Sequence, residues 1–115
     1  MKIPKSIRTV VIACFLITMF AILMMMALGR NHNGFAQCLT QKGVVMYGTE
    51  HCPACIQQKE LFGKSFKYVN YIDCNLRREE CAEIQYTPTW EFSDGGQVVG
   101  YLELSQLSKM SGCKI

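Results

Sequence analysis

The sequence predicts an α/β fold in which helices flank a central mixed sheet of four strands, preceded by one N-terminal transmembrane helix. Three observations predict it. Residues 44–47 form a short apolar strand-like run, which leads into Cys-Pro-Ala-Cys at 52–55 and then into helix-forming residues. A second strand-like segment, 66–73, completes a β-α-β unit. Residues 10–28 are almost wholly apolar and long enough to cross a bilayer.

The apolar N-terminal run is the first element. Between Val10 and Leu28 the only polar side chains are Cys14 and Thr18, and nineteen helical residues rise about 28 Å, close to the hydrocarbon thickness of a membrane. We therefore expect residues 1–29 to be a basic cytoplasmic flank and a membrane anchor, and residues 30–34 to be a polar linker. The domain itself is expected over 35–115.

Charge placement predicts the orientation of this anchor. All three excess positive charges precede the apolar run, whereas residues 30–115 carry nine basic and nine acidic side chains. The positive-inside tendency then places the N-terminus in the cytoplasm and the domain in the periplasmic or extracellular space. A secreted domain is the alternative, because Ala27-Leu28-Gly29 and Gly34-Phe35-Ala36 each resemble a signal-peptide cleavage site. Since no basic run is interleaved with aromatic residues, we expect no nucleic-acid partner.

The remaining elements follow from local patterns. A lead-in helix ends at Gly43, and strand 44–47 is broken by Gly48. A polar segment with three apolar residues that share one face predicts a short helix, and Pro88 marks the start of a strand that an Asp-Gly-Gly turn joins to the last strand. A final amphipathic helix ends at Gly112. The expected helices are thus 35–42, 53–62, 75–84 and 102–111, and the expected strands are 44–47, 66–73, 86–92 and 97–101.

The Cys-Pro-Ala-Cys motif is typical of a thiol-disulfide active site. If the helix begins at Cys52 or Pro53, unsatisfied backbone N-H groups and the positive end of the helix dipole favour the Cys52 thiolate, the nucleophile. Cys55 lies one turn later, where it can close a disulfide with Cys52 and act as the resolving thiol. Pro53 suits the first helical position because its missing N-H has no partner there.

Several blocks of sequence, in this order, resemble the thioredoxin superfamily, and in particular the thioredoxin-like domain that partners bacterial homologues of vitamin K epoxide reductase, fused or separate. The blocks are Met46-Tyr47-Gly48, Cys52-Pro53-Ala54-Cys55, Gln58 to Gly63, Thr87-Pro88-Thr89-Trp90 and Ser111-Gly112-Cys113. The resemblance implies that Cys52 attacks, that Cys55 resolves, and that Pro88 is cis and faces them. It also implies that Thr87 offers backbone hydrogen bonds to a bound peptide.

The chain departs from this family at two places. Ala54 replaces the histidine usual inside the motif, where an imidazole can stabilise the thiolate. Met46 occupies the position of the buried acid that many thioredoxins use for proton transfer to the resolving thiol. Glu50 and His51 lie beside the motif; they are either exposed loop residues or modest tuning groups. Pro53, within the motif, is a third possible tuning residue.

The other cysteines suggest structural bridges, since an exported setting allows disulfides. Six cysteines follow the apolar run, and fifteen pairings are open. The resembling domains carry a pair in the region of Cys74 and Cys81, which predicts a bridge there, and a bridge from Cys38 to Cys113 would then tie the ends of the domain together. An electron relay through Cys74 and Cys81 is the alternative. A zinc site made by these two with the motif cysteines is disfavoured, because their six-residue spacing is too wide.

The sequence thus predicts a membrane-anchored, extracytoplasmic thiol-disulfide oxidoreductase that needs no metal or organic cofactor. Its expected partners are protein thiols and disulfides and a quinone-reducing membrane protein of the vitamin K epoxide reductase type, to which it would pass electrons. Two alternatives remain open. One is a reductase or isomerase kept reduced by a membrane electron donor, and the other is a non-catalytic docking module whose CxxC forms a structural disulfide.

Overall fold

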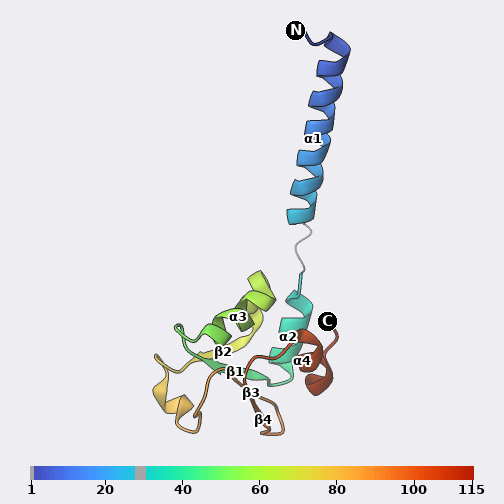
Figure 1. Ribbon diagram of the computed structural model, residues 1–115. Coiled ribbons are helices and arrows are strands. Elements are labelled where there is room, and N and C mark those ends of the chain that lie inside the picture. The colour runs from blue at the N-terminus through green and yellow to red at the C-terminus, as the bar shows by residue number, and fades with distance from the viewer. Residues whose placement is uncertain (1, 28–30) are drawn as a thin grey trace. The chain divides into compact units, whose positions relative to one another are not determined.

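The computed structural model describes residues 2–27 and 31–115, which fall into two compact units (Figure 1). The first unit contains α1 (Lys5–Ala27), none of whose residues is buried. By length and composition α1 could cross a membrane, although a signal sequence would share both properties. Leu28, Gly29 and Arg30, where the predicted anchor meets the predicted linker, lie outside the described residues.

The second unit is built on a mixed four-stranded sheet in the order β2-β1-β3-β4. β1 and β2 are the strands of the predicted β-α-β unit and pair in parallel, whereas β1 pairs antiparallel with β3, which in turn pairs antiparallel with β4. The predicted sheet is therefore confirmed, with shorter strands: β1 is Val45–Gly48, β2 is Asn70–Asp73, β3 is Thr89–Glu91 and β4 is Gln97–Val99. Gly48 is the last residue of β1 and pairs with Asp73.

One face of the sheet carries the main hydrophobic core. Met46 of β1 and Trp90 of β3 are paired residues, so their side chains leave the same face, and both are fully buried. Trp90 lies 6.1 Å from Phe62, ring centroid to ring centroid. Helices from three parts of the chain contribute to this core: α2 (Asn33–Gln41), α3 (Pro53–Phe62) and α4 (Leu104–Ser111).

The other face is covered by the loop between β2 and β3, drawn yellow to orange in Figure 1. Tyr47 and Ile72 pack there with Cys81, which ends the 3₁₀ helix η2 (Arg78–Cys81). The predicted helix over 75–84 is wrong in length. Cys74 and Cys81 are joined by a disulfide with their Cα atoms 5.6 Å apart, whereas seven residues of α-helix would rise about 10 Å. The bridge therefore requires a folded-back loop with one short helical turn.

The predicted strand over 66–73 is also half helical. Its first residues belong to the 3₁₀ helix η1 (Gly63–Tyr68), and only Asn70–Asp73 forms β2. Phe66 explains the difference, because its ring packs between Phe62 at 6.1 Å and Tyr71 at 5.4 Å instead of extending along the sheet. The alternation of aromatic residues along the chain predicted a strand, but these side chains instead pack into the core beneath the end of α3.

The ends of the domain are fixed by polar contacts and a disulfide. The Ser65 hydroxyl accepts from the His32 N-H at 3.0 Å and donates to Asn33 Oδ1 at 2.8 Å, so α2 begins two residues earlier than expected. At the other end, α4 stops at Gly112, whose φ of +76° is the left-handed conformation that favours glycine. The element order, the mixed sheet and the helix-covered core make this a thioredoxin-like α/β fold.

Candidate active site

Cys52 caps the N-terminus of α3. Its sulfur accepts a hydrogen bond from the Cys55 N-H at 3.2 Å, one of the backbone donors that a helix leaves unpaired in its first turn. Pro53 follows as the first helical residue, so its missing N-H removes a donor that the helix does not use. The Cys52 sulfur therefore lies at the positive end of the helix, as the sequence predicted.

The environment of Cys52 favours its thiolate. Burial has the largest single effect and raises the pKa of Cys52, but hydrogen bonds from the Cys55 thiol, from Thr87 and from the backbone amides of Cys55 and Ala54 lower it. Together these hydrogen bonds outweigh burial, and the pKa lies below that of an ordinary cysteine. Ala54 thus contributes only its backbone amide to stabilising the thiolate, whereas the histidine usual at this position in the resembling family would add an imidazole.

Cys55 has the opposite properties. Its side chain is fully buried in the main core. Burial raises the pKa of the Cys55 thiol, and its hydrogen bond to the Cys52 sulfur adds to the effect. The two sulfurs, both free thiols in the structure, therefore differ in exposure and acidity in the sense needed for an attacking and a resolving thiol.

The segment before β3 lies against Cys52. The Thr87-Pro88 peptide bond is cis, and Pro88 is buried. The Cys52 thiol donates to the Thr87 carbonyl at 3.4 Å, which brings this segment to the N-terminus of α3. The structure thus places the four predicted residues of the site, Cys52, Cys55, Thr87 and Pro88, side by side.

The suggested tuning residues differ in their relation to this site. Glu50 and His51 are exposed on the turn between β1 and α3, and Pro53 is exposed at the start of the helix. Of the three, Glu50 reaches the buried part of the site through its charge, because it is one of the groups that raise the pKa of Tyr71.

The remaining domain cysteines form two disulfides. Cys38 of α2 is joined to Cys113 after α4, and Cys74 after β2 is joined to Cys81 of η2. These are the two pairs predicted above. Because their sulfurs are occupied, Cys52 and Cys55 are the free thiols of the domain, and Cys14 of α1 is a third, exposed free thiol.

Gln58 is a structural residue of the site that the sequence did not reveal. It is fully buried on α3, one turn after Cys55. Its amide oxygen accepts from Trp90 Nε1 at 3.2 Å and from the Leu102 N-H at 2.8 Å, while its amide nitrogen donates to the Leu102 carbonyl at 2.9 Å. These bonds attach α3 to β3 and to the segment before α4, which fixes the helix that carries both cysteines.

Tyr71 is the second residue that the sequence missed. Its side chain lies beneath α3, where the Lys59 ammonium sits 4.1 Å from the centre of the ring. Burial, followed by the charges of Asp73, Cys55, Glu50 and Cys52, raises the pKa of Tyr71 to about 12. Only the strand register places this tyrosine at Cys55, so its aromatic character in the sequence gave no sign of it.

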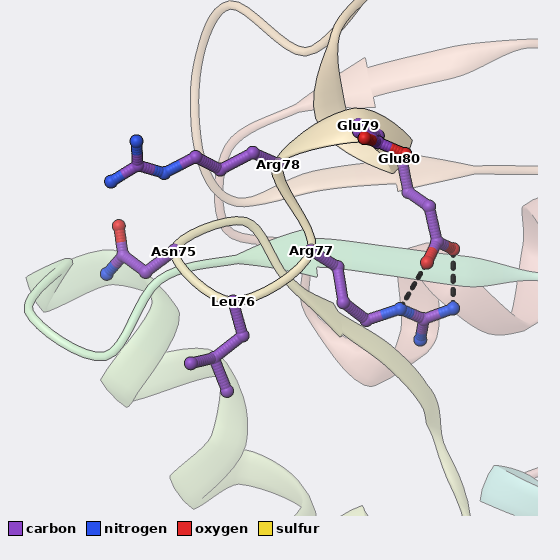
Figure 2. Close-up of a pocket in the computed structure, with 6 residues that line it drawn as sticks. All are labelled: Asn75, Leu76, Arg77, Arg78, Glu79 and Glu80. Atoms are coloured by element: carbon purple, nitrogen blue, oxygen red, sulfur yellow. Dashed lines mark hydrogen bonds and ion pairs between the residues drawn. The ribbon is translucent and has the colours of Figure 1, made fainter.

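The surface hollow shown in Figure 2 does not contain the cysteines of the site. It has a volume of about 440 Å³ and is lined by consecutive residues of the loop that the Cys74–Cys81 disulfide closes, Asn75 to Glu80. The Arg77 guanidinium and the Glu80 carboxylate pair with each other, while Arg78 points away from them. Thiol-disulfide exchange with a protein needs an accessible sulfur rather than an enclosed cavity, so this hollow does not bear on the site.

Within residues 2–27 and 31–115, no three side chains of the kinds that bind metals are grouped to hold an ion. The comparison with known proteins points to thiol chemistry instead. The chain is 34% identical over 88 residues to the thiol-disulfide oxidoreductase LTO1 of Arabidopsis thaliana, an alignment that covers 67% of this chain and 23% of that protein. The chain thus spans about a quarter of the length of this relative. No protein-family model matches the sequence.

Proposed function

We propose that this protein is a membrane-anchored, extracytoplasmic thiol-disulfide oxidoreductase that uses Cys52 and Cys55. The observation that carries the proposal is the asymmetry of the two thiols at the start of α3. Cys52 accepts a helix N-H and has a lowered pKa, whereas Cys55 is fully buried and has a raised pKa. The similarity to a named thiol-disulfide oxidoreductase supports the same chemistry.

The exchange proceeds through a mixed disulfide. A substrate thiolate attacks Cys52 Sγ of the oxidised pair; the Cys52–Cys55 bond breaks, and Cys55 leaves as a thiolate that takes a proton from solvent. A second substrate thiolate then attacks the substrate sulfur of the mixed disulfide and displaces Cys52 as a thiolate. Two electrons have passed from the substrate to the pair, and the substrate has gained a disulfide.

The lowered pKa of Cys52 supports this oxidising direction. A stabilised Cys52 thiolate stabilises the reduced pair, and a couple whose reduced form is stabilised is the stronger oxidant. The reduced pair must then return its electrons. The resemblance of the quoted sequence blocks to partners of vitamin K epoxide reductase homologues supports a quinone-reducing membrane protein as the acceptor, and α1 would hold the domain beside it.

Thr87 and Pro88 are the proposed substrate contacts. The Thr87 carbonyl lies 3.4 Å from the Cys52 sulfur, so a peptide held by the backbone at this position would present its own sulfur to Cys52. The hydrogen bonds that hold this peptide would be made by main-chain groups, which suits an enzyme that acts on many proteins. We assign the Cys38–Cys113 and Cys74–Cys81 disulfides to structure, because each ties loops or ends of the domain outside the site.

Cys52→Ser and Cys55→Ser variants of the full chain in detergent test the proposal by insulin reduction. We expect Cys52→Ser to abolish activity. We expect Cys55→Ser to accumulate a mixed disulfide at Cys52, because the sulfur that resolves it is gone. Cys14→Ser, which changes the free thiol of α1, should retain activity. Full activity of Cys52→Ser would show that the site is wrongly assigned and would favour the docking-module alternative.

A further inference from the structure

The hydroxyl group of Tyr71 is buried without a hydrogen-bond partner among the described residues. A buried tyrosine usually places its hydroxyl against a donor or an acceptor, because an unpaired polar group loses the hydrogen bonds of water. An unpaired hydroxyl in a small, well-packed core is consistent with a partner that the hydroxyl meets only in another state of the protein. Its neighbours show which state that is.

Tyr71 and Cys55 meet across Gly48. A Cβ atom at Gly48 would lie 3.2 Å from Cys55 Sγ, 3.2 Å from Tyr71 Oη and 2.9 Å from Tyr71 Cε2. The Cys55 sulfur and the Tyr71 hydroxyl oxygen therefore lie at most about 6.4 Å apart, the sum of their two 3.2 Å distances to this Cβ atom. Glycine at this position adds no side chain beside either group, whereas a Cβ atom there would touch both.

The register of the sheet gives Tyr71 a particular place. Tyr71 on β2 pairs with Met46 on β1, so both side chains point to the face that α3 covers. The thioether of Met46 cannot donate a hydrogen bond. Of these two paired residues, only Tyr71 carries a hydrogen-bond donor on the side of Cys55.

The groups that surround Tyr71 keep its hydroxyl protonated. Burial and the negative charges of Asp73, Cys55, Glu50 and Cys52 raise its pKa to about 12. The Lys59 ammonium, 4.1 Å from the ring centre, contacts the face of the ring rather than the hydroxyl group. Phe66, which also packs against the ring, is apolar and adds no charge. At neutral pH Tyr71 is therefore a hydrogen-bond donor that does not give up its proton.

We propose that Tyr71 donates a hydrogen bond to the sulfur of Cys55 when that sulfur carries negative charge, and so stabilises the Cys55 thiolate during disulfide exchange. This inference rests on the proposed function of Cys52 and Cys55. In the thiol form seen here the hydroxyl is unbonded. Because the oxygen lies on the rotation axis of the ring, a tilt of the whole side chain, rather than a turn of the ring, would bring it to the charged sulfur. A neutral donor suits a buried site, because it stabilises the transient thiolate without placing a permanent charge in the core.

The same hydrogen bond acts in both directions of the reaction. When Cys52 is attacked by a substrate thiolate, Cys55 leaves as a thiolate and Tyr71 stabilises the leaving group. In reverse, Cys55 loses its proton to solvent and attacks Cys52 Sγ of the mixed disulfide; the Cys52–Cys55 bond forms, and the substrate leaves as a thiolate that is reprotonated. Tyr71 keeps its own proton throughout, and the electron pair moves only between sulfurs.

Resolution of a mixed disulfide by Cys55 tests the inference. The reduced full chain, in detergent and with Cys14→Ser to remove the thiol of α1, is mixed with oxidised glutathione at several pH values. Acid-quenched samples are separated by mass into the mixed disulfide and the Cys52–Cys55 disulfide. Tyr71→Phe removes the hydroxyl alone. Tyr47→Phe is the matched control, because its hydroxyl lies on the opposite face of the sheet, 3.4 Å from Glu91.

We expect Tyr71→Phe to slow resolution by about tenfold at neutral pH and to move its pH midpoint upward, because a hydrogen bond to a charged sulfur is lost. Formation of the mixed disulfide at Cys52 should be unchanged, and Tyr47→Phe should behave as the parent chain does. The inference is overturned if Tyr71→Phe has the same pH profile of resolution as the parent chain. It is also overturned if formation and resolution of the mixed disulfide slow equally, which would indicate a general loosening of the domain. If the parent chain forms no mixed disulfide, the proposed function itself fails.

Discussion

Cys52 and Cys55 show how backbone geometry alone can separate two chemically identical thiols. One sulfur lies at the start of α3 and accepts a helix N-H, while the other lies one turn later in the core. The sequence predicted this division from the CxxC spacing and from Pro53. It could not predict that an aromatic hydroxyl and a buried amide would complete the site, because both depend on contacts between strands and helices far apart in the chain.

The pH dependence of alkylation tests this difference at the residue scale. Since the pKa of Cys52 is lowered, its thiolate persists to lower pH than that of an ordinary cysteine, and iodoacetamide should modify it with a midpoint below about 8.5. The pKa of Cys55 is raised, so its modification should be slower and should need higher pH. Peptide mass mapping of the reduced chain measures both. A midpoint for Cys52 above that of Cys55 would contradict the assigned roles.

At the scale of elements, the regular patterns were predictable and the exceptions have local causes. The strands, α3 and the Gly112 stop follow from apolar runs and glycine positions. The helix expected over 75–84 failed because a disulfide between Cys74 and Cys81 holds their Cα atoms 5.6 Å apart. The strand expected over 66–73 forms only over Asn70–Asp73, because Phe66 packs against Phe62 and Tyr71. In both cases a tertiary contact outweighed the local propensity.

The attachment of α3 to the rest of the domain depends on Gln58. Gln58→Leu would leave Trp90 Nε1 and both backbone groups of Leu102 without this partner, and we expect the free energy of unfolding to fall by about 3 kcal/mol. Gln57→Leu is the matched control, since Gln57 is exposed on the same helix and should change stability by about 0.5 kcal/mol or less.

Urea unfolding of the full chain in detergent measures both variants, with the fluorescence of Trp90, the only tryptophan, as the signal. Equal stability of Gln58→Leu and the parent chain would show that the buried amide does not hold the helix. A loss in Gln57→Leu as large as that in Gln58→Leu would show that the effect belongs to the apolar substitution itself.

At the scale of the whole molecule, the chain combines an apolar helix of membrane-span length with a small domain that two disulfides stabilise. The sequence predicted the architecture because its blocks occur in the order of a thioredoxin-like fold. The residues alone left the pairing of the six domain cysteines open, because pairing depends on which helix and strand ends come together in the fold. In the folded domain, α2 and the end of α4 meet through Cys38 and Cys113.

The two disulfides should differ in their contribution to stability. The Cys38–Cys113 bridge spans 75 residues and the Cys74–Cys81 bridge spans 7, so restriction of the unfolded chain predicts losses of about 4 and about 2 kcal/mol when each pair is replaced by alanine. Urea unfolding of the two double variants provides the measurement. A larger loss from the shorter bridge would indicate that Cys74–Cys81 acts chiefly by holding the folded loop.

The redox potential of the Cys52/Cys55 couple, measured in the full chain by equilibration with glutathione buffers, tests the central claim most directly. A stabilised Cys52 thiolate predicts an oxidising couple, at about -120 to -180 mV. A value near that of thioredoxin, about -270 mV, would contradict the oxidising direction and favour a reductase. A value below about -300 mV, typical of structural bridges, would contradict the exchange site itself.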